Sequence, residues 1–192
     1  AYSLAIQGIA DELILVDLKD QKLASEVQDL RDSVAYMPHR VSVRAGDFSD
    51  LAECDVIVNS VGKIDLLRGN TDRVAEMKFT VPAVRSYVQK IKDSGFNGVL
   101  INITNPCDVV TYELAKGLAL PRGRVFGTGT GLDTARLLSA LARQTGVDQK
   151  SITCYMLGEH GNQQFAPWSC VSFNGMPLDK WAETDERFRF DR

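Results

Sequence analysis

Three side chains in the last third of the sequence have types and spacing suited to proton transfer on a small carboxylic acid. His160 lies between glycines in the segment 158–161, and histidine exchanges protons near neutral pH. Asp133 and Arg136 are three residues apart and share one face of a predicted helix start. The aspartate can fix a histidine tautomer, and the arginine fork matches a carboxylate. The plainer alternative is a helical ion pair worth about 0.3–0.5 kcal/mol, which spacing alone favours.

Two further residues follow loops in which a ligand can lie. Asn105 precedes a proline, so its backbone is restricted and can be cis. Its amide can reach a carbonyl oxygen or His160, or it can serve only as a turn residue. Arg73 follows the loop 62–72 and is either a solvated arginine or a residue that closes over a substrate.

Asp17 ends an apolar run, at a position where a carboxylate can bind both hydroxyls of an adenosine ribose. It would repel a 2′-phosphate and therefore favours NAD over NADP. A helix-capping aspartate is the common alternative, and Asp17 taken alone favours that alternative.

The elements that must position these residues are short apolar runs alternating with segments of helical period. A strand at 12–17 precedes a helix with Leu23, Val27, Leu30 and Val34 on one face. Pro82 should kink or divide the helical segment 73–94. The remaining predicted strands are 41–44, 55–59, 98–103, 124–127 and 152–157, and the remaining predicted helices are 107–117 and 132–145.

This alternation predicts an α/β fold, a parallel sheet covered on both faces. Ligands of such sheets bind beyond the carboxyl ends of the strands. The polar residues of interest follow those ends: Asp17, Gly62, Asn105, the segment 127–130 and His160.

Composition excludes several other classes. The 192 residues carry a net charge of −3 and no basic run or zinc-ligand spacing, which argues against nucleic-acid binding and a metal site. The four cysteines form no CxxC pair and are expected to be reduced, mostly buried thiols. The first ten residues are too short for a signal peptide or membrane span, so a cytoplasmic location is expected. His39, in a polar stretch, is expected to be a surface residue.

Several motifs in register resemble the lactate/malate dehydrogenase superfamily. They are Asn105-Pro-Cys-Asp108, Gly127-Thr-Gly-Thr-Gly-Leu-Asp-Thr-Ala-Arg136 and Leu157-Gly-Glu-His-Gly-Asn162. Asp17 with Lys22 resembles the family's adenosine-ribose segment, and Asp72-Arg73 resembles the end of its substrate-covering loop. The glutamate before the histidine, Glu159, is similar to the residue found at that position in the lactate branch of the family. The segment 158–168 is most similar to L-2-hydroxyisocaproate dehydrogenases. Arg68, in the substrate-selecting loop 63–70, leaves a malate-type dicarboxylate substrate open.

The resemblance implies a doubly wound Rossmann-type domain and a reversible transfer between NAD(H) and a small 2-hydroxy or 2-keto acid. His160 would exchange the proton with the substrate, and Asp133 would orient the His160 ring. Arg136 would hold the substrate carboxylate. Arg73 would polarise the substrate carbonyl, and Asn105 would position the substrate. Gly62 and Lys22 would lie along the cofactor and Phe48 near its adenine. The family is usually dimeric or tetrameric.

The resemblance also implies missing parts. The family begins with a strand and a GxGxxG turn, and neither is found in this sequence. Residues 1–9 are similar to the helix that follows that turn in the family. We expect residues 1–128 to be an incomplete NAD-binding domain and 129–192 the start of an α+β substrate domain. The parent would have about 300 residues, and this chain alone would be neither stable nor active. A catalytically silent nucleotide-binding relative is the alternative in another class.

Overall fold

The computed structural model describes residues 1–62 and 73–190 and divides into two compact units. The first comprises Ala1–Ile57 and Tyr87–Val99, and the second Val58–Ser86 and Leu100–Arg192. The predicted loop 63–70, with Arg68, lies outside the described residues, and so does Asp72.

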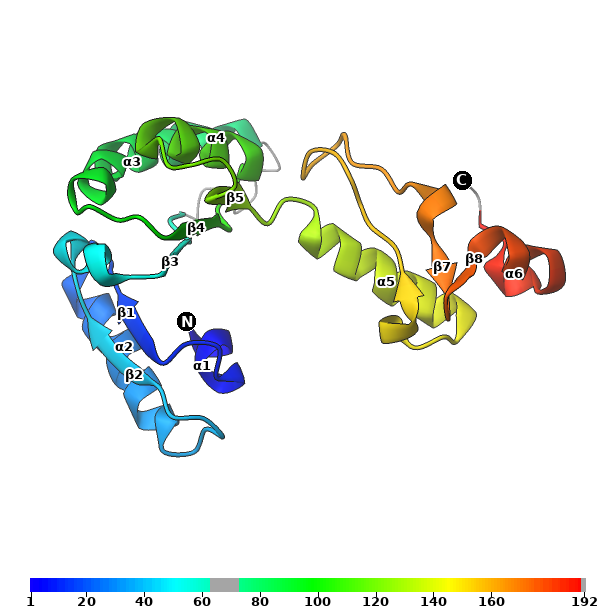
Figure 1. Ribbon diagram of the computed structural model, residues 1–192, viewed down its shortest axis with the longest axis horizontal. Coiled ribbons are helices and arrows are strands. Elements are labelled where there is room, and N and C mark those ends of the chain that lie inside the picture. The colour runs from blue at the N-terminus through cyan, green and yellow to red at the C-terminus, as the bar shows by residue number, and fades with distance from the viewer. Residues whose placement is uncertain (63–72, 191–192) are drawn as a thin grey trace. The chain divides into compact units, whose positions relative to one another are not determined.

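The first unit contains a two-stranded parallel sheet beside a long helix (Figure 1). Strand β1 (Glu12–Leu15) pairs with β2 (Ser42–Ala45), with Leu13 opposite Val43. Helix α2 (Asp20–Val34) connects them, α1 (Tyr2–Gln7) precedes β1, and the 3-10 helix η1 (Phe48–Glu53) follows β2. The core of this unit consists of Ala5, Leu13, Val27, Leu30, Val41 and Val43.

The apolar stripe of α2 is the part of that helix that the sequence predicted best. Val27 and Leu30 are buried, and Leu23 and Val34 pack against the same core. Asp20 in the first turn and Arg31 in the last complement the helix dipole. Arg31 also donates from Nε to the carbonyl of Val43 at 2.7 Å, which attaches the helix to the sheet.

A second sheet has the order β3-β4-β5, formed by Val56–Asn59, Val99–Asn102 and Val125–Gly127. Strands β4 and β5 are parallel, with Asn102 opposite Gly127. Helix α4 (Cys107–Leu118) connects them and buries Val110 and Leu114.

Helix α3 (Arg73–Asp93) is a single helix, so the expected division at Pro82 is wrong and a kink there stays a prediction. The proline ring removes one amide donor, which leaves the carbonyl four residues earlier, that of Lys78, without its helical partner. Lys78 is exposed, so water can satisfy that carbonyl. The loss of one hydrogen bond therefore does not end the helix.

The last third of the chain folds around α5 (Gly131–Thr145). It adds an antiparallel sheet of β6 (Ile152–Thr153), β7 (Ser172–Phe173) and β8 (Met176–Pro177), followed by α6 (Leu178–Thr184) and η5 (Glu186–Phe188) (Figure 1). Short 3-10 turns occupy Gln149–Ser151 and Trp168–Cys170. The core here is Leu141, Ile152, Cys154, Val171, Phe173, Leu178 and Phe188.

The predicted strand 152–157 is wrong beyond its first two residues. Only Ile152 and Thr153 pair in the sheet, with a further isolated bridge between Leu157 and Phe165. Between them, both backbone groups of Met156 bond to threonine side chains rather than to a neighbouring strand. Side-chain partners thus replace the β-ladder where the chain approaches His160.

The fold is α/β with parallel sheets, as predicted, and an α+β portion follows it. The four cysteines are free: Cys107 and Cys154 are buried, Cys54 is half-buried and Cys170 is exposed. His39 is exposed, as expected. In the described part of the chain, no helix has the length and apolar character needed to cross a membrane.

Candidate active site

The start of α5 carries two of the predicted site residues. Helix α5 follows the glycine-containing segment 127–130, and its C-terminal end is closed by Gly146 in the left-handed region (φ 76°). Asp133 lies in the first turn and is buried, whereas the side chain of Arg136 is 66% exposed. Oδ1 of Asp133 accepts from Nη1 of Arg136 at 3.3 Å.

His160 joins this pair through the other carboxylate oxygen. Its Nδ1 lies 2.5 Å from Oδ2 of Asp133, and its side chain is 19% exposed. Burial opposes ionisation of Asp133, but the hydrogen bond and charge of His160, helped by Arg136, outweigh it and lower the pKa of Asp133. Asp133 is therefore an anion that holds the imidazole and leaves Nε2 for another partner.

Two threonines on either side of Asp133 attach the His160 segment to α5. Thr130 Oγ1 donates to the carbonyl of Met156 at 2.5 Å, and Thr134 Oγ1 accepts from the amide of Met156 at 2.9 Å. The backbone amide of His160 donates at 3.3 Å to Oδ2 of Asp108, a residue in the first turn of α4. The histidine segment is thus bonded to two helices.

Asn105 lies in the loop between β4 and α4, and its bond to Pro106 is cis, as the sequence allowed. Its backbone carbonyl accepts from Oγ1 of the buried Thr80 at 3.1 Å. The buried side chain of Asn102 contacts Asn59, Thr104, Cys107 and Thr111. This network fixes the backbone on both sides of Asn105.

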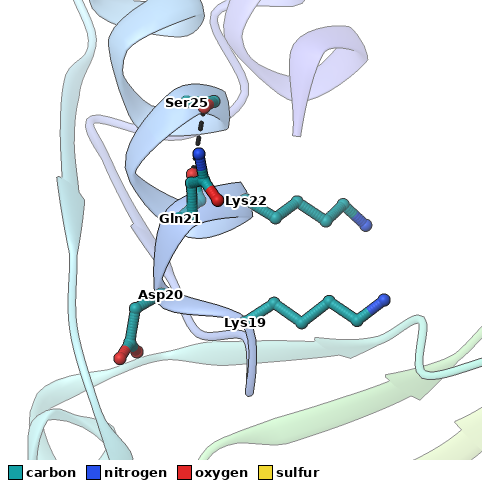
Figure 2. A pocket seen from close by; sticks show the side chains of 5 residues that line it. All are labelled: Lys19, Asp20, Gln21, Lys22 and Ser25. Atoms are coloured by element: carbon teal, nitrogen blue, oxygen red, sulfur yellow. Dashed lines mark hydrogen bonds between the residues drawn. The ribbon is translucent and has the colours of Figure 1, made fainter.

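The end of β1 carries the proposed ribose ligand. Oδ1 of Asp17 accepts from the amide of Lys19 at 3.0 Å, and Oδ2 lies 3.7 Å from Nζ of Lys22. A hollow of about 570 Å³ is lined by Lys19, Asp20, Gln21, Lys22 and Ser25. Figure 2 shows the two lysine side chains extending in the same direction and Asp20 pointing away from them. The exposed Asp17 retains acceptor capacity for ribose hydroxyls, so these residues fit a nucleotide.

The remaining predicted residues are less informative. Phe48 is half-buried and its ring stacks with Tyr87 (centroids 6.3 Å apart), with Lys90 Nζ 5.4 Å from the centroid, so its contact with adenine stays a prediction. Among the described residues, no atom beyond its two chain neighbours lies within 4 Å of a Cβ built on Gly62, and the contact of Gly62 with the cofactor stays a prediction. Arg73 begins α3, and its side chain is outside the described part.

Sequence reasoning missed the residues that hold the site together, among them Asp108, Thr130, Thr134 and Asn102. The spacing of Thr130 and Thr134 around Asp133 was a signal, because residues four apart share a helix face. Within residues 1–62 and 73–190, no three His, Cys, Asp or Glu side chains are grouped so that they could hold a metal ion.

Comparison with known proteins decides the family. Residues 1–127 match the lactate/malate dehydrogenase NAD-binding domain, and residues 130–191 match the α/β C-terminal domain of the same group. The chain belongs to the lactate/malate dehydrogenase family. The part that binds nucleotide in this family is its NAD-binding domain, so the cofactor is NAD.

Curated members of the family that match are named L-lactate dehydrogenases. That of Fusobacterium nucleatum subsp. nucleatum is 40% identical over 190 residues, which are 98% of this chain and 59% of that protein. L-lactate dehydrogenase 2 of Listeria monocytogenes serotype 4b is 40% identical over 182 residues, 95% of this chain and 58% of the relative. The chain therefore spans less than two thirds of the length of these relatives.

Solved structures of the family agree in fold. A lactate dehydrogenase from a Medee basin deep-sea metagenome library superposes with a TM-score of 0.91 at 32% identity, covering 98% of this chain and 60% of that one. The ligand-bound minor L-lactate dehydrogenase of Enterococcus mundtii gives 0.90 at 33% identity, covering 97% and 59%. The Cryptosporidium parvum enzyme, complexed with lactic acid and NAD, gives 0.88 at 25% identity, covering 98% and 60%.

Proposed function

We propose that the protein containing this chain is an NAD-dependent dehydrogenase that interconverts a small L-2-hydroxy acid and its 2-keto acid. The observation that carries the proposal is the bond between His160 and the buried anion Asp133, with Arg136 on the same carboxylate. A nucleotide-binding relative without catalysis has no use for this arrangement.

His160 is the proposed proton donor and acceptor. The bond from Nδ1–H to Asp133 leaves Nε2 for the substrate oxygen, and in the protonated ring Nε2 carries the proton that is given to that oxygen during ketone reduction. Asp133 stabilises the protonated ring before the transfer. In the oxidation direction the same nitrogen accepts the hydroxyl proton.

Substrate binding falls to residues around this pair. Arg136 is largely exposed, and its fork is proposed to hold the substrate carboxylate. Asn105, held by Thr80 and the Asn102 network, is proposed to orient the carbonyl. Arg73 is proposed to polarise that carbonyl from the start of α3.

NAD supplies the hydride acceptor or donor when bound. Asp17 is proposed to bind the adenosine ribose hydroxyls, which favours NAD over NADP because a 2′-phosphate would face its carboxylate. Lys22, Gly62, Phe48 and Asn105 are also proposed to contact the cofactor. The adjacent matches at 1–127 and 130–191 support a domain boundary at 128/129.

The names of the relatives favour lactate and pyruvate as substrates. A branched 2-hydroxyisocaproate-type substrate is the second candidate, supported by the Gly158–Trp168 segment. Malate is the less favoured one, since it depends on Arg68 alone. We also propose a cytoplasmic homodimer or homotetramer, as is usual in this family.

The test is NADH oxidation by the full-length protein with pyruvate, 2-ketoisocaproate and oxaloacetate. We expect turnover with one of the first two and its loss in His160→Asn, with NADH binding by fluorescence retained. His39→Asn, at the other and exposed histidine, is the matched control and should keep wild-type turnover. NADH binding without turnover of any of the three acids would refute the dehydrogenase assignment and support a silent relative.

A further inference from the structure

The backbone of His160 has a partner that the proposed chemistry does not use. Its amide donates to Oδ2 of Asp108 at 3.3 Å, a contact between residues 52 positions apart. Asp108 lies in the first turn of α4, directly after the loop that carries Asn105. The contact therefore connects the loop of one proposed substrate-binding residue to the backbone of the proposed proton donor.

The segment around His160 requires such an anchor. Gly158 adopts φ 95° and Gly161 follows the histidine, so residues with wide backbone freedom lie on both sides. The bonds to Thr130 and Thr134 act at Met156, four residues earlier. The bond from Asp133 fixes the ring at Nδ1 but leaves the backbone free to move with it.

We propose that Asp108 is a positioning residue, which holds the His160 backbone so that the ring can reach Asp133 and the substrate together. The inference depends on the proposed function, because His160 is taken as the proton donor. What the inference adds is that the Asp108 carboxylate acts through its hydrogen bond to the His160 amide.

A purely structural role for Asp108 makes a different prediction. An acidic residue in the first turn also favours α4 through the helix dipole, and Lys116 in its last turn does the same at the other end. Lys116→Ala is therefore the matched control, since it weakens the same helix without contacting His160.

The kinetic test uses Asp108→Ala and Asp108→Asn in the full-length protein. We expect Asp108→Ala to lower kcat by about tenfold or more, because small displacements of catalytic groups can cost up to a hundredfold. The KM for NADH should stay unchanged. Asp108→Asn, whose amide oxygen still accepts from the His160 amide, should restore most of kcat, and Lys116→Ala should match wild type. An unchanged kcat in Asp108→Ala, or an equal loss in both Asp108 variants, would overturn the proposal.

A second measurement does not depend on turnover. In the full-length protein, nitrogen-15 NMR assigns the His160 signals as those lost in His160→Asn and the signals of the exposed His39 as those lost in His39→Asn. We expect the Nδ1–H signal of His160, which is hydrogen-bonded to Asp133, to weaken in Asp108→Ala and to persist in Asp108→Asn, with His39 unchanged. If that signal is identical in wild type and Asp108→Ala, the positioning role is refuted even if no substrate is turned over. If the wild type turns over no keto acid but the signal behaves as expected, only the proposed function fails.

Discussion

The carboxylate of Asp133, in the first turn of α5, binds the ring of His160 at 2.5 Å between Oδ2 and Nδ1. The two residues are 27 positions apart in the sequence, and Thr130 and Thr134 hold the segment before His160 against the same helix through the backbone of Met156. The lowered pKa of Asp133 keeps it ionised at neutral pH, so the imidazole faces a permanent anion.

Replacing Asp133 with asparagine should test this relationship directly. The amide can donate to Nδ1, which would favour the wrong tautomer and remove the anion that stabilises the protonated ring. We expect kcat to fall by about a hundredfold or more, the scale of general acid–base catalysis. The full-length protein is assayed for NADH oxidation.

Asp29→Asn, on the exposed face of α2, provides the control for that measurement. It removes one carboxylate of the same type and should leave kcat unchanged. Wild-type kcat in Asp133→Asn would mean that His160 is not the proton donor.

Arg136 should separate substrate binding from stability. Its ion pair with Asp133 is exposed on the arginine side, and exposed i,i+3 pairs contribute little to folding. Arg136→Lys keeps the charge but loses the fork, so we expect KM for the keto acid to rise about 10- to 100-fold, the effect of a charged hydrogen bond.

The melting temperature of Arg136→Lys should change little, and the Kd for NADH should not change. A KM equal to that of wild type would exclude Arg136 as the carboxylate ligand. A large fall in melting temperature would instead identify the residue as structural.

The buried amide of Asn102 should matter for stability. Its Oδ1 accepts from Nδ2 of Asn59 at 2.8 Å and from the amide of Thr104 at 3.2 Å, and its Nδ2 lies 3.1 Å from the carbonyls of Thr104 and Cys107. Asn102→Ala removes these hydrogen bonds from a buried site, although Asn59 Nδ2 still lies 3.4 Å from Thr104 Oγ1 and the carbonyl of Cys107 still accepts from Thr111 Oγ1. Unfolding in urea should show a loss of about 1–3 kcal/mol or more, the cost of burying one unsatisfied group.

The exposed Asn162 gives the comparison for this substitution. Asn162→Ala should change the free energy of unfolding by less than about 0.5 kcal/mol, as surface substitutions usually do. Equal stability of the two variants would show that the Asn102 network contributes nothing.

The sequence predicted the elements whose signal is periodic. The stripe of Val27 and Leu30 predicted α2, and the apolar run before Asn105 predicted β4. It also predicted Asp133, Arg136 and His160 as site residues from long motifs that retain their spacing, and the structure brings the three side chains together. These features depend on local sequence or on motif register.

The errors arose where long-range partners decide the structure. The run 152–157 has strand composition, yet threonine side chains from α5 take the backbone groups of Met156. Pro82 predicted an interruption, but an exposed carbonyl needs no helical partner. The Asp108 contact with His160 spans 52 positions and involves a backbone amide, so side-chain type gave no indication of it.

Acid should remove the contribution of one surface ion pair near the C-terminal end. The side chain of Arg187 donates to Asp185, as does its backbone amide, and these bonds lower the pKa of Asp185 below its ordinary value of 3.8. A lowered folded-state pKa stabilises the protein above the unfolded value, and that stabilisation is lost as pH falls through the folded value. The melting temperature of Asp185→Asn should therefore lie below that of wild type at pH 7. The difference should begin to shrink as pH falls to about 4, the unfolded pKa of aspartate, and should vanish only below the lower pKa of the folded state. Asp148→Asn makes the same carboxylate-to-amide change at the cap of another 3-10 turn, where no arginine of the described residues pairs with the carboxylate, and serves as the control for that change. A difference between Asp185→Asn and wild type that stays constant from pH 7 to pH 3 would show that the charge of Asp185 is not what stabilises this turn.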